Sequence, residues 1–174
     1  MFKKIILLIF IFFPLNSYGL IKVDITRGNL NPLPIAVSPL ATDKDSKKEF
    51  EKILNNKDIG SEISTIVERN LRASGLFNPL SKDAFLQKPE IANLKPRFED
   101  WKLIKAQALI TGKVNFINEK LRVEFRLWDI LAGREMMALA FTTVPTNWRR
   151  VGHIISDKVY ERLTGEKGYF DTRI

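Results

Sequence analysis

Apolar residues alternate with polar ones in several stretches of the chain, which predicts a domain rich in β-strands. Ile21, Val23 and Ile25 alternate with charged or polar neighbours and predict a strand with one apolar face. A short apolar run over residues 34–39, bounded by prolines, predicts a second and more buried strand. Residues 76–80 predict a third, short strand.

Three longer strand-like runs follow at residues 108–116, 121–130 and 135–144, separated by two short loops. Short loops between strands are typical of antiparallel pairing, so these runs predict an antiparallel meander. In the middle run Leu121, Val123, Phe125 and Leu127 alternate with Arg122, Glu124, Arg126 and Trp128. This alternation predicts a sheet with one face in the core and the other face in solvent.

Two main helices are predicted from apolar residues at three- and four-residue spacing. The first is capped by Asp58, carries its apolar stripe over residues 59–71 and is stopped by Gly75. The second covers residues 148–163, with Thr146 or Asn147 as its cap, and Thr164 and Gly165 end it.

The remaining segments carry weaker patterns. A short helix over residues 98–104 is predicted to place Trp101 in the core rather than in a ligand site. Residues 41–56 are charged and poor in apolar side chains, so we expect a mobile loop with at most one helical turn. Residues 82–97, with two prolines, predict a long surface loop. The fold class is therefore α+β, a mixed α/β arrangement in which a sheet with an antiparallel meander packs on two main helices.

Length and composition agree with one folded domain plus tails. The chain has 174 residues, of which 45% are hydrophobic and 28% are charged, as in ordinary globular proteins. Residues 166–174 follow the last helix, and Tyr169, Phe170 and Ile174 look like the first strand of a further domain that is not present. We therefore expect a second domain to be missing.

The first residues have the pattern of an export signal. Lys3 and Lys4 precede an apolar run over residues 5–13, and small residues follow up to Gly19. The run is too short for a membrane span, which needs about 20 apolar residues. We expect a signal peptide over residues 1–19, cleaved after Gly19, and an exported chain with no stable membrane insertion. Removing the two lysines lowers the formal charge from +8 to +6.

The residues needed for most catalytic and metal sites are lacking. The chain has no Cys and one His, so thiolate zinc sites, iron–sulfur clusters and Cys nucleophiles are excluded. His153 and Asp157 lie four residues apart on a helix, where we expect a simple surface pair rather than metal ligands. Phosphate-binding, dinucleotide-binding and serine-nucleophile motifs are not found. We expect no catalytic residues, no metal, no cofactor and no enzymatic activity.

Two other features are candidates for binding. A strand close to a free N-terminus can pair with the edge of a partner sheet, although on physical grounds alone an ordinary first strand of its own sheet is the simpler interpretation. Trp148, Arg149 and Arg150, together with the basic charge, favour a small nucleic-acid-binding domain as the alternative function. Export makes nucleic acid an improbable partner, and a helix start is the simpler interpretation of these three residues.

The chain resembles the amino-terminal domain of the TolB family, periplasmic proteins of the Tol-Pal system in Gram-negative bacteria. The resemblance is most specific over residues 148–174, above all from Leu163-Thr164-Gly165 to the final Thr172-Arg173-Ile174. It also covers residues 21–28, 34–40, 71–77 and 108–114, and Trp101.

The resemblance implies an α/β domain followed by a β-propeller that binds the lipoprotein Pal. It implies that the first residues after the signal contact the periplasmic C-terminal domain of TolA, and that they can also fold back on their own domain. The TolA-binding residues carried over are Leu20, Ile21, Lys22, Val23, Asp24, Ile25, Thr26, Arg27 and Gly28.

These implications divide the chain into four parts: the signal at 1–19, a mobile TolA-binding segment at 20–33, the α/β domain at 34–165 and the start of a missing propeller at 166–174. Since the sequence stops where the propeller should begin, we expect Pal binding only if a propeller is supplied, from a longer protein or a split gene. The implied function is a periplasmic adaptor for outer-membrane integrity and for outer-membrane invagination at cell division.

Overall fold

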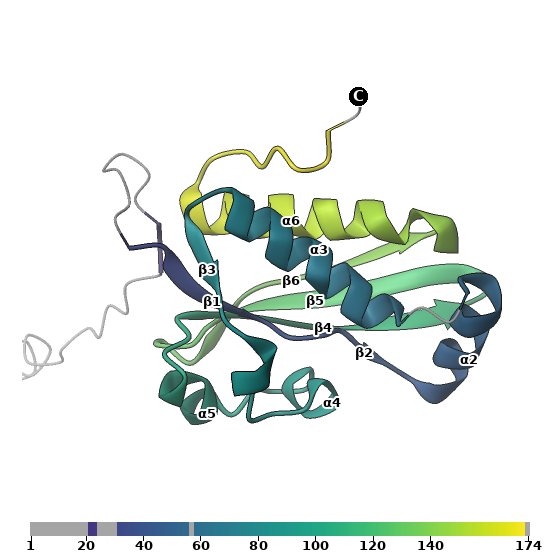
Figure 1. Cartoon of the computed structure of the whole chain (residues 1–174), viewed down its shortest axis with the longest axis horizontal. Helices are drawn as coiled ribbons and strands as arrows, with labels where there is room; N and C mark the ends of the chain where they lie inside the picture. Colours follow the sequence, from purple (N-terminus) through teal and green to yellow (C-terminus); the bar gives the residue numbers. More distant parts are fainter. Residues whose placement is uncertain (1–20, 24–30, 56–57, 173–174) are drawn as a thin grey trace, which may run out of the picture.

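The computed structural model describes residues 21–23, 31–55 and 58–172, which are built around one mixed β-sheet (Figure 1). Its strands are β1 (Leu33–Val37), β2 (Ala41–Thr42), β3 (Phe77–Pro79), β4 (Ala108–Ile117), β5 (Lys120–Asp129) and β6 (Arg134–Thr143). They lie in the order β3-β1-β4-β5-β6, and β2 also pairs with β4. The pairs β1–β3, β1–β4 and β2–β4 are parallel, whereas β4–β5 and β5–β6 form the predicted antiparallel meander.

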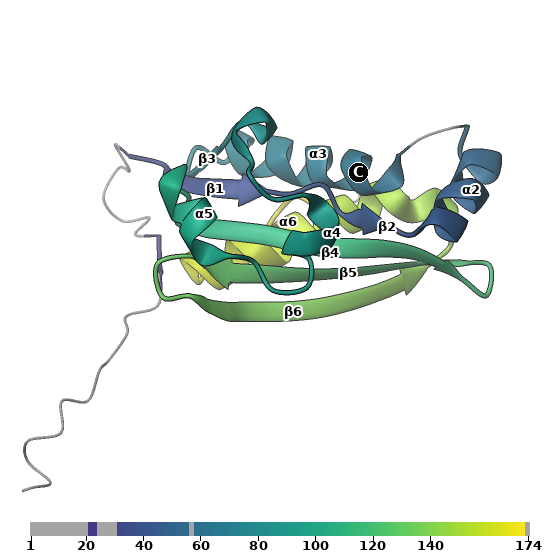
Figure 2. The same ribbon diagram turned by 90° about the horizontal axis from the view of Figure 1, so that it is seen from below.

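Helices lie on both sides of this sheet. The two longest, α3 (Ile59–Ala73) and α6 (Trp148–Thr164), pack side by side on one face, as predicted (Figure 1). The short helices α4 (Pro89–Ala92) and α5 (Phe98–Leu103) lie on the opposite face (Figure 2). Helix α2 (Lys44–Ile53) lies beside the end of β4, and two 3-10 turns cover Lys82–Ala84 and Pro145–Asn147. The α+β fold class is thus confirmed.

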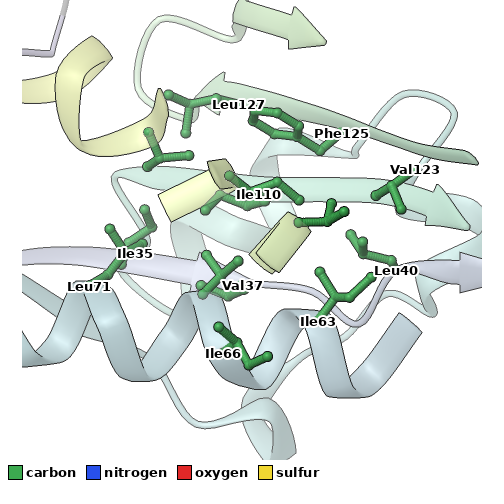
Figure 3. Close-up of a cluster of buried hydrophobic side chains, with 14 of the residues drawn as sticks. Ile35, Val37, Leu40, Ile63, Ile66, Leu71, Ile110, Val123, Phe125 and Leu127 are labelled. Carbon is green, nitrogen blue, oxygen red and sulfur yellow. The ribbon is translucent and has the colours of Figure 1, made fainter. Parts of the chain in front are cut away.

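The main core fills the space between the sheet and helices α3 and α6 (Figure 3). Ile35, Ile63 and Leu127 are fully buried there, so the strands and helices contribute their predicted apolar faces. The two helices approach closely at Gly152, where a Cβ atom would lie 2.8 Å from Cγ2 of Ile66. The predicted helix stops at Gly75 and Gly165 are confirmed, because both glycines have positive φ angles of 73° and 84°.

The opposite face of the sheet is less exposed to solvent than its alternation predicts. Trp128, expected in solvent with its charged neighbours, is only 7% exposed, and its indole N–H donates to Oγ1 of Thr111 at 2.9 Å. Phe98 and Trp101 of α5 pack in the same second cluster, and Trp101 is buried as predicted. The prediction for Trp128 was wrong because α5 covers that end of the sheet with a second, smaller core.

The prediction of a loop over residues 41–56 is also wrong, because α2 occupies most of that range. The carboxylate of Asp43 accepts hydrogen bonds from the backbone N–H groups of Asp45 and Ser46 and so caps the helix. The hydroxyl of Ser46 donates to Asp43 at 2.6 Å and accepts from the N–H of Phe116 at 2.7 Å. Phe50 is buried against the Phe116 ring, so one aromatic side chain anchors a helix with few other apolar residues.

Two further expectations differ from the structure in detail. Asn147 occupies the cap position of α6, but its amide donates to Oγ1 of Thr143 at 3.2 Å and makes no capping hydrogen bond. Residues 82–97 form the expected irregular segment apart from α4 and one 3-10 turn.

In the described part of the chain, none of the helices has both the length and the apolar character to cross a bilayer.

Candidate functional site

The N-terminal segment, residues 21–23, is docked against the end of α6 and the last residue of β5. The backbone N–H of Val23 donates to the carbonyl oxygen of Leu163 at 2.8 Å. The backbone N–H of Ile21 donates to Oδ2 of Asp129 at 3.3 Å. The Val23 side chain is 4% exposed within the main core, and Ile21 packs against that core from its edge.

The Leu163 carbonyl and the Asp129 carboxylate both need a hydrogen-bond donor from outside their own helix or strand. The last carbonyls of an α-helix have no partner within the helix, and Leu163 is one residue before the end of α6. Asp129 is fully buried, and its Oδ1 accepts a hydrogen bond from the N–H of Ala132 at 2.8 Å. The docked segment therefore supplies a donor to a helix-end carbonyl and a second donor to a buried carboxylate.

A groove of about 620 Å³ lies beside the docked segment. Its lining residues come from the segment, from β6, from the last two turns of α6 and from the glycine that ends this helix: Ile21, Lys22, Met137, Lys158, Glu161, Arg162 and Gly165. The ammonium of Lys158 pairs with Glu161 at 3.0 Å, and Nε of Arg162 donates to the carbonyl oxygen of Met136 at 3.2 Å. With three cationic side chains and one carboxylate, this groove favours an anionic ligand.

The predicted binding residues fall partly inside this site. Ile21, Lys22 and Val23 are brought together beside α6, but they form no strand and do not join the sheet. Leu20, Asp24, Ile25, Thr26, Arg27 and Gly28 lie outside the described residues, as does the predicted signal over residues 1–19. Sequence reasoning missed Asp129 and the Leu163 carbonyl, since a backbone acceptor has no sequence signal and Asp129 lies within a strand pattern.

The expected pair of His153 and Asp157 does not form. Nδ1 of His153 lies 2.9 Å from Nδ2 of Asn70 on the neighbouring helix α3. Asp157 instead accepts the backbone N–H groups of Phe170 at 2.7 Å and Asp171 at 3.1 Å. Among the described residues, no group of three or more His, Asp or Glu side chains is arranged to hold a metal ion.

The segment after α6 is held against that helix and is not a strand over residues 166–172. The guanidinium of Arg150 pairs with Asp171 at 3.0 Å, an interaction that raises the pKa of Arg150. The rings of Tyr169 and Phe170 meet the ring of Tyr160 edge to face. Burial among these groups raises the pKa of Tyr160, and the nearby Tyr169 and Glu166 add to the effect.

The three residues at the start of α6 do not form a base-stacking platform. Trp148 is only 3% exposed, so its ring is a core group. The guanidinium carbon of Arg149 lies 4.2 Å from the centroid of that ring, and Arg150 is paired with Asp171. These contacts agree with the simpler interpretation as a helix start.

Comparison with known proteins identifies the family. The sequence pattern of the TolB amino-terminal domain matches residues 21–136 of this chain. The chain belongs to the TolB family. It is 74% identical over all 174 residues to the Tol-Pal system protein TolB of Pelagibacter ubique, and it spans 39% of that relative's length. The crystal structure of TolB from Acinetobacter baumannii has the same fold, with a TM-score of 0.64 at 22% identity, over 81% of this chain and 30% of that one.

Family membership confirms the resemblance that the sequence suggested. TolB proteins are periplasmic, non-enzymatic components of the Tol-Pal system. The match at 22% identity concerns the fold alone.

Proposed function

We propose that this chain is a periplasmic adaptor of the Tol-Pal system that binds TolA through its N-terminal segment. The binding residues would be 20–28, and the role would be to support outer-membrane integrity and outer-membrane invagination during division. The observation that carries the proposal is that residues 21–23 are docked on the domain without being a strand of its sheet. A segment held by separate contacts is easier to release than one held by a full ladder of strand hydrogen bonds.

The docked and the TolA-bound arrangements would exclude each other. The side chain of Val23 is buried, and the N–H groups of Ile21 and Val23 are already bonded to the domain. Pairing of these residues with the edge of a TolA sheet would require their release from α6. TolA would then select the released conformation and pay the free energy of undocking.

The domain limits follow the same proposal. Residues 1–19 would be a cleaved export signal, residues 20–33 the TolA-binding segment and residues 34–165 the folded domain. Residues 166–174 would lead toward a propeller, and Pal would bind only where that propeller is supplied. A nucleic-acid partner receives no support from the residues that suggested it, because Trp148 is buried and Arg150 is paired with Asp171.

Calorimetric titration of the chain from Leu20 onward against the C-terminal domain of TolA tests this function. Deletion of residues 20–28 should abolish binding, with the folded domain checked by circular dichroism. A point substitution in the segment, Ile25→Asp, should weaken binding by about tenfold or more, since a charge would replace one apolar pocket contact. The matched change Ile53→Asp, at a residue 45% exposed on α2, should leave binding unchanged. Equal binding by the intact chain and the deletion would refute the proposal.

A further inference from the structure

Strand β6 forms one edge of the sheet, with no neighbouring strand on its outer side among the described residues (Figure 2). Nine of its ten residues, Arg134–Thr143, pair with β5, and the remaining one, Met136, lies at a bulge. In an antiparallel pair only alternate residues bond a given neighbour, so the others direct their backbone N–H and C=O groups outward. β6 therefore presents a long row of backbone groups that can accept another strand.

From Met137 onward, β6 lacks the usual protection of such an edge, since its one bulge lies at Met136 near its start. Natural edges are protected by lysine, proline, inward-pointing charges or β-bulges. In β6 the charges are confined to Arg134 and Glu135 at its start, and residues 136–143 are uncharged and contain no proline. An edge with eight successive residues that are uncharged and not proline is more typical of an interface than of a solvent-exposed boundary.

Successive side chains of β6 lie on opposite faces of the sheet, so a partner strand would meet two different surfaces. Met137, Leu139 and Phe141 lie opposite buried residues of β5 and face the core side, where Leu139 remains 37% exposed. On the other face Ala138 and Ala140 are small and exposed, so they leave room for a partner's side chains. An added strand would extend the core with its apolar side chains beside Leu139.

The charged residues near the β6 edge indicate which charge a partner strand should carry. The groove at the start of β6 is lined by Lys22, Lys158 and Arg162, against Glu161 alone. The Arg162 guanidinium lies at the edge itself, since it donates to the carbonyl oxygen of Met136. Acidic side chains at the matching end of a partner strand would meet these cations.

We propose that the β6 edge, together with Lys22, Lys158 and Arg162, binds an extended acidic segment of a partner protein by strand addition. The site shares Lys22 with the TolA-binding segment of the proposed function, but the backbone that pairs is a different one: there the chain donates a strand, and here β6 receives one. A second copy of this chain is a poorer occupant, because each copy has 28 basic and 20 acidic residues and the two would repel.

The test uses two fluorescent hexapeptides, one alternating Val with Glu and the other alternating Val with Lys, titrated against the chain from Leu20 onward. The acidic peptide should bind saturably and shift the backbone amide resonances of β6 more than those of the opposite edge, β3. The basic peptide should bind at least about tenfold more weakly, because the groove is cationic. Equal binding of both peptides, or no binding of either, would overturn the proposal.

Two pairs of matched variants assign the binding to the edge. Leu139→Glu should weaken the acidic peptide by about tenfold, whereas Leu103→Glu, at a 74% exposed leucine on α5, should have no effect. Lys158→Ser and Lys102→Ser each remove a lysine from a helical pair with glutamate, and only the first should weaken binding. Loss of binding in both members of a pair would contradict the assignment.

Sedimentation measurements address the competing occupant. The chain should remain monomeric over the concentrations used in the titration, and circular dichroism should show that Leu139→Glu is folded. A concentration-dependent dimer that Leu139→Glu abolishes would assign the edge to a second copy and overturn the proposal.

Discussion

The buried carboxylate of Asp129 holds the N-terminal segment through the N–H of Ile21, and its replacement by asparagine should release that segment. Asparagine has the same shape, and its Oδ1 can still accept the N–H of Ala132 that organises the turn. Its amide nitrogen would then face the N–H of Ile21, so two donors would meet where a donor now meets an acceptor. The change therefore acts on docking while it retains the turn.

The size of the effect follows from that one contact. A hydrogen bond to a charged group contributes about 1.5–3 kcal/mol, and the 3.3 Å distance to Ile21 favours the lower end. A loss of about 1.4 kcal/mol lowers the ratio of docked to released segment about tenfold. Where the docked form predominates, the apparent dissociation constant for TolA should fall by about the same factor.

Two measurements on Asp129→Asn check this reasoning. Calorimetry should show tighter binding to the TolA C-terminal domain, and hydrogen exchange should show faster exchange of the Val23 amide, whose bond to Leu163 would open more often. Asp83→Asn, at an exposed aspartate in the 3-10 turn before α4, is the matched control and should change neither quantity. Faster Val23 exchange without tighter TolA binding would refute the competition between docking and TolA.

Three stability predictions concern other contacts. Asp43→Ala removes the cap of α2 and should cost about 1 kcal/mol in urea unfolding. Hydrogen bonds from the Ser46 hydroxyl and from backbone amides lower the pKa of Asp43 in the folded chain. The stabilisation by the cap should therefore be complete above the ordinary aspartate pKa of about 3.9 and be lost as the pH falls through the lower pKa of the folded state. A cost of Asp43→Ala that does not change with pH would contradict this prediction. Gly152→Ala should destabilise the chain, because overpacking costs about 1–3 kcal/mol against about 1 kcal/mol gained in helix propensity. Ile66→Ala in the same chain should reduce the cost of Gly152→Ala, and additive effects in a double-mutant cycle would contradict the contact. Gly168→Ala would place a Cβ atom on the backbone of Asp157 and should release the segment after α6, so resistance to proteolysis equal to that of the wild type would count against that contact.

The parts of the fold that were predicted correctly depend on local periodicity. The meander follows from alternation along residues 108–144, and α3 from a stripe that begins after Asp58 and stops at Gly75. Apolar spacing of this kind indicates which face of an element packs into the main core.

The parts that were missed depend on contacts between distant residues. Helix α2 is held by the Ser46 hydroxyl bonded to the N–H of Phe116, 70 positions later in the chain. Trp128 is buried because α5 covers a face that its charged neighbours indicated to be open. The docking of Ile21 on Asp129 spans 108 positions, and the acceptor for Val23 is a backbone carbonyl. The sequence could therefore indicate the binding segment but not the place where it docks.

Helix α6 fastens both ends of the described chain. Its Leu163 carbonyl holds Val23, and its Asp157 carboxylate holds the N–H groups of Phe170 and Asp171. These two anchor points are six residues apart, which is about 9 Å along a helix at 1.5 Å per residue. While these hydrogen bonds hold, a mechanical load applied between residues 23 and 170 would pass through this short stretch of helix, and the hydrogen bonds between the strands would carry little of the force.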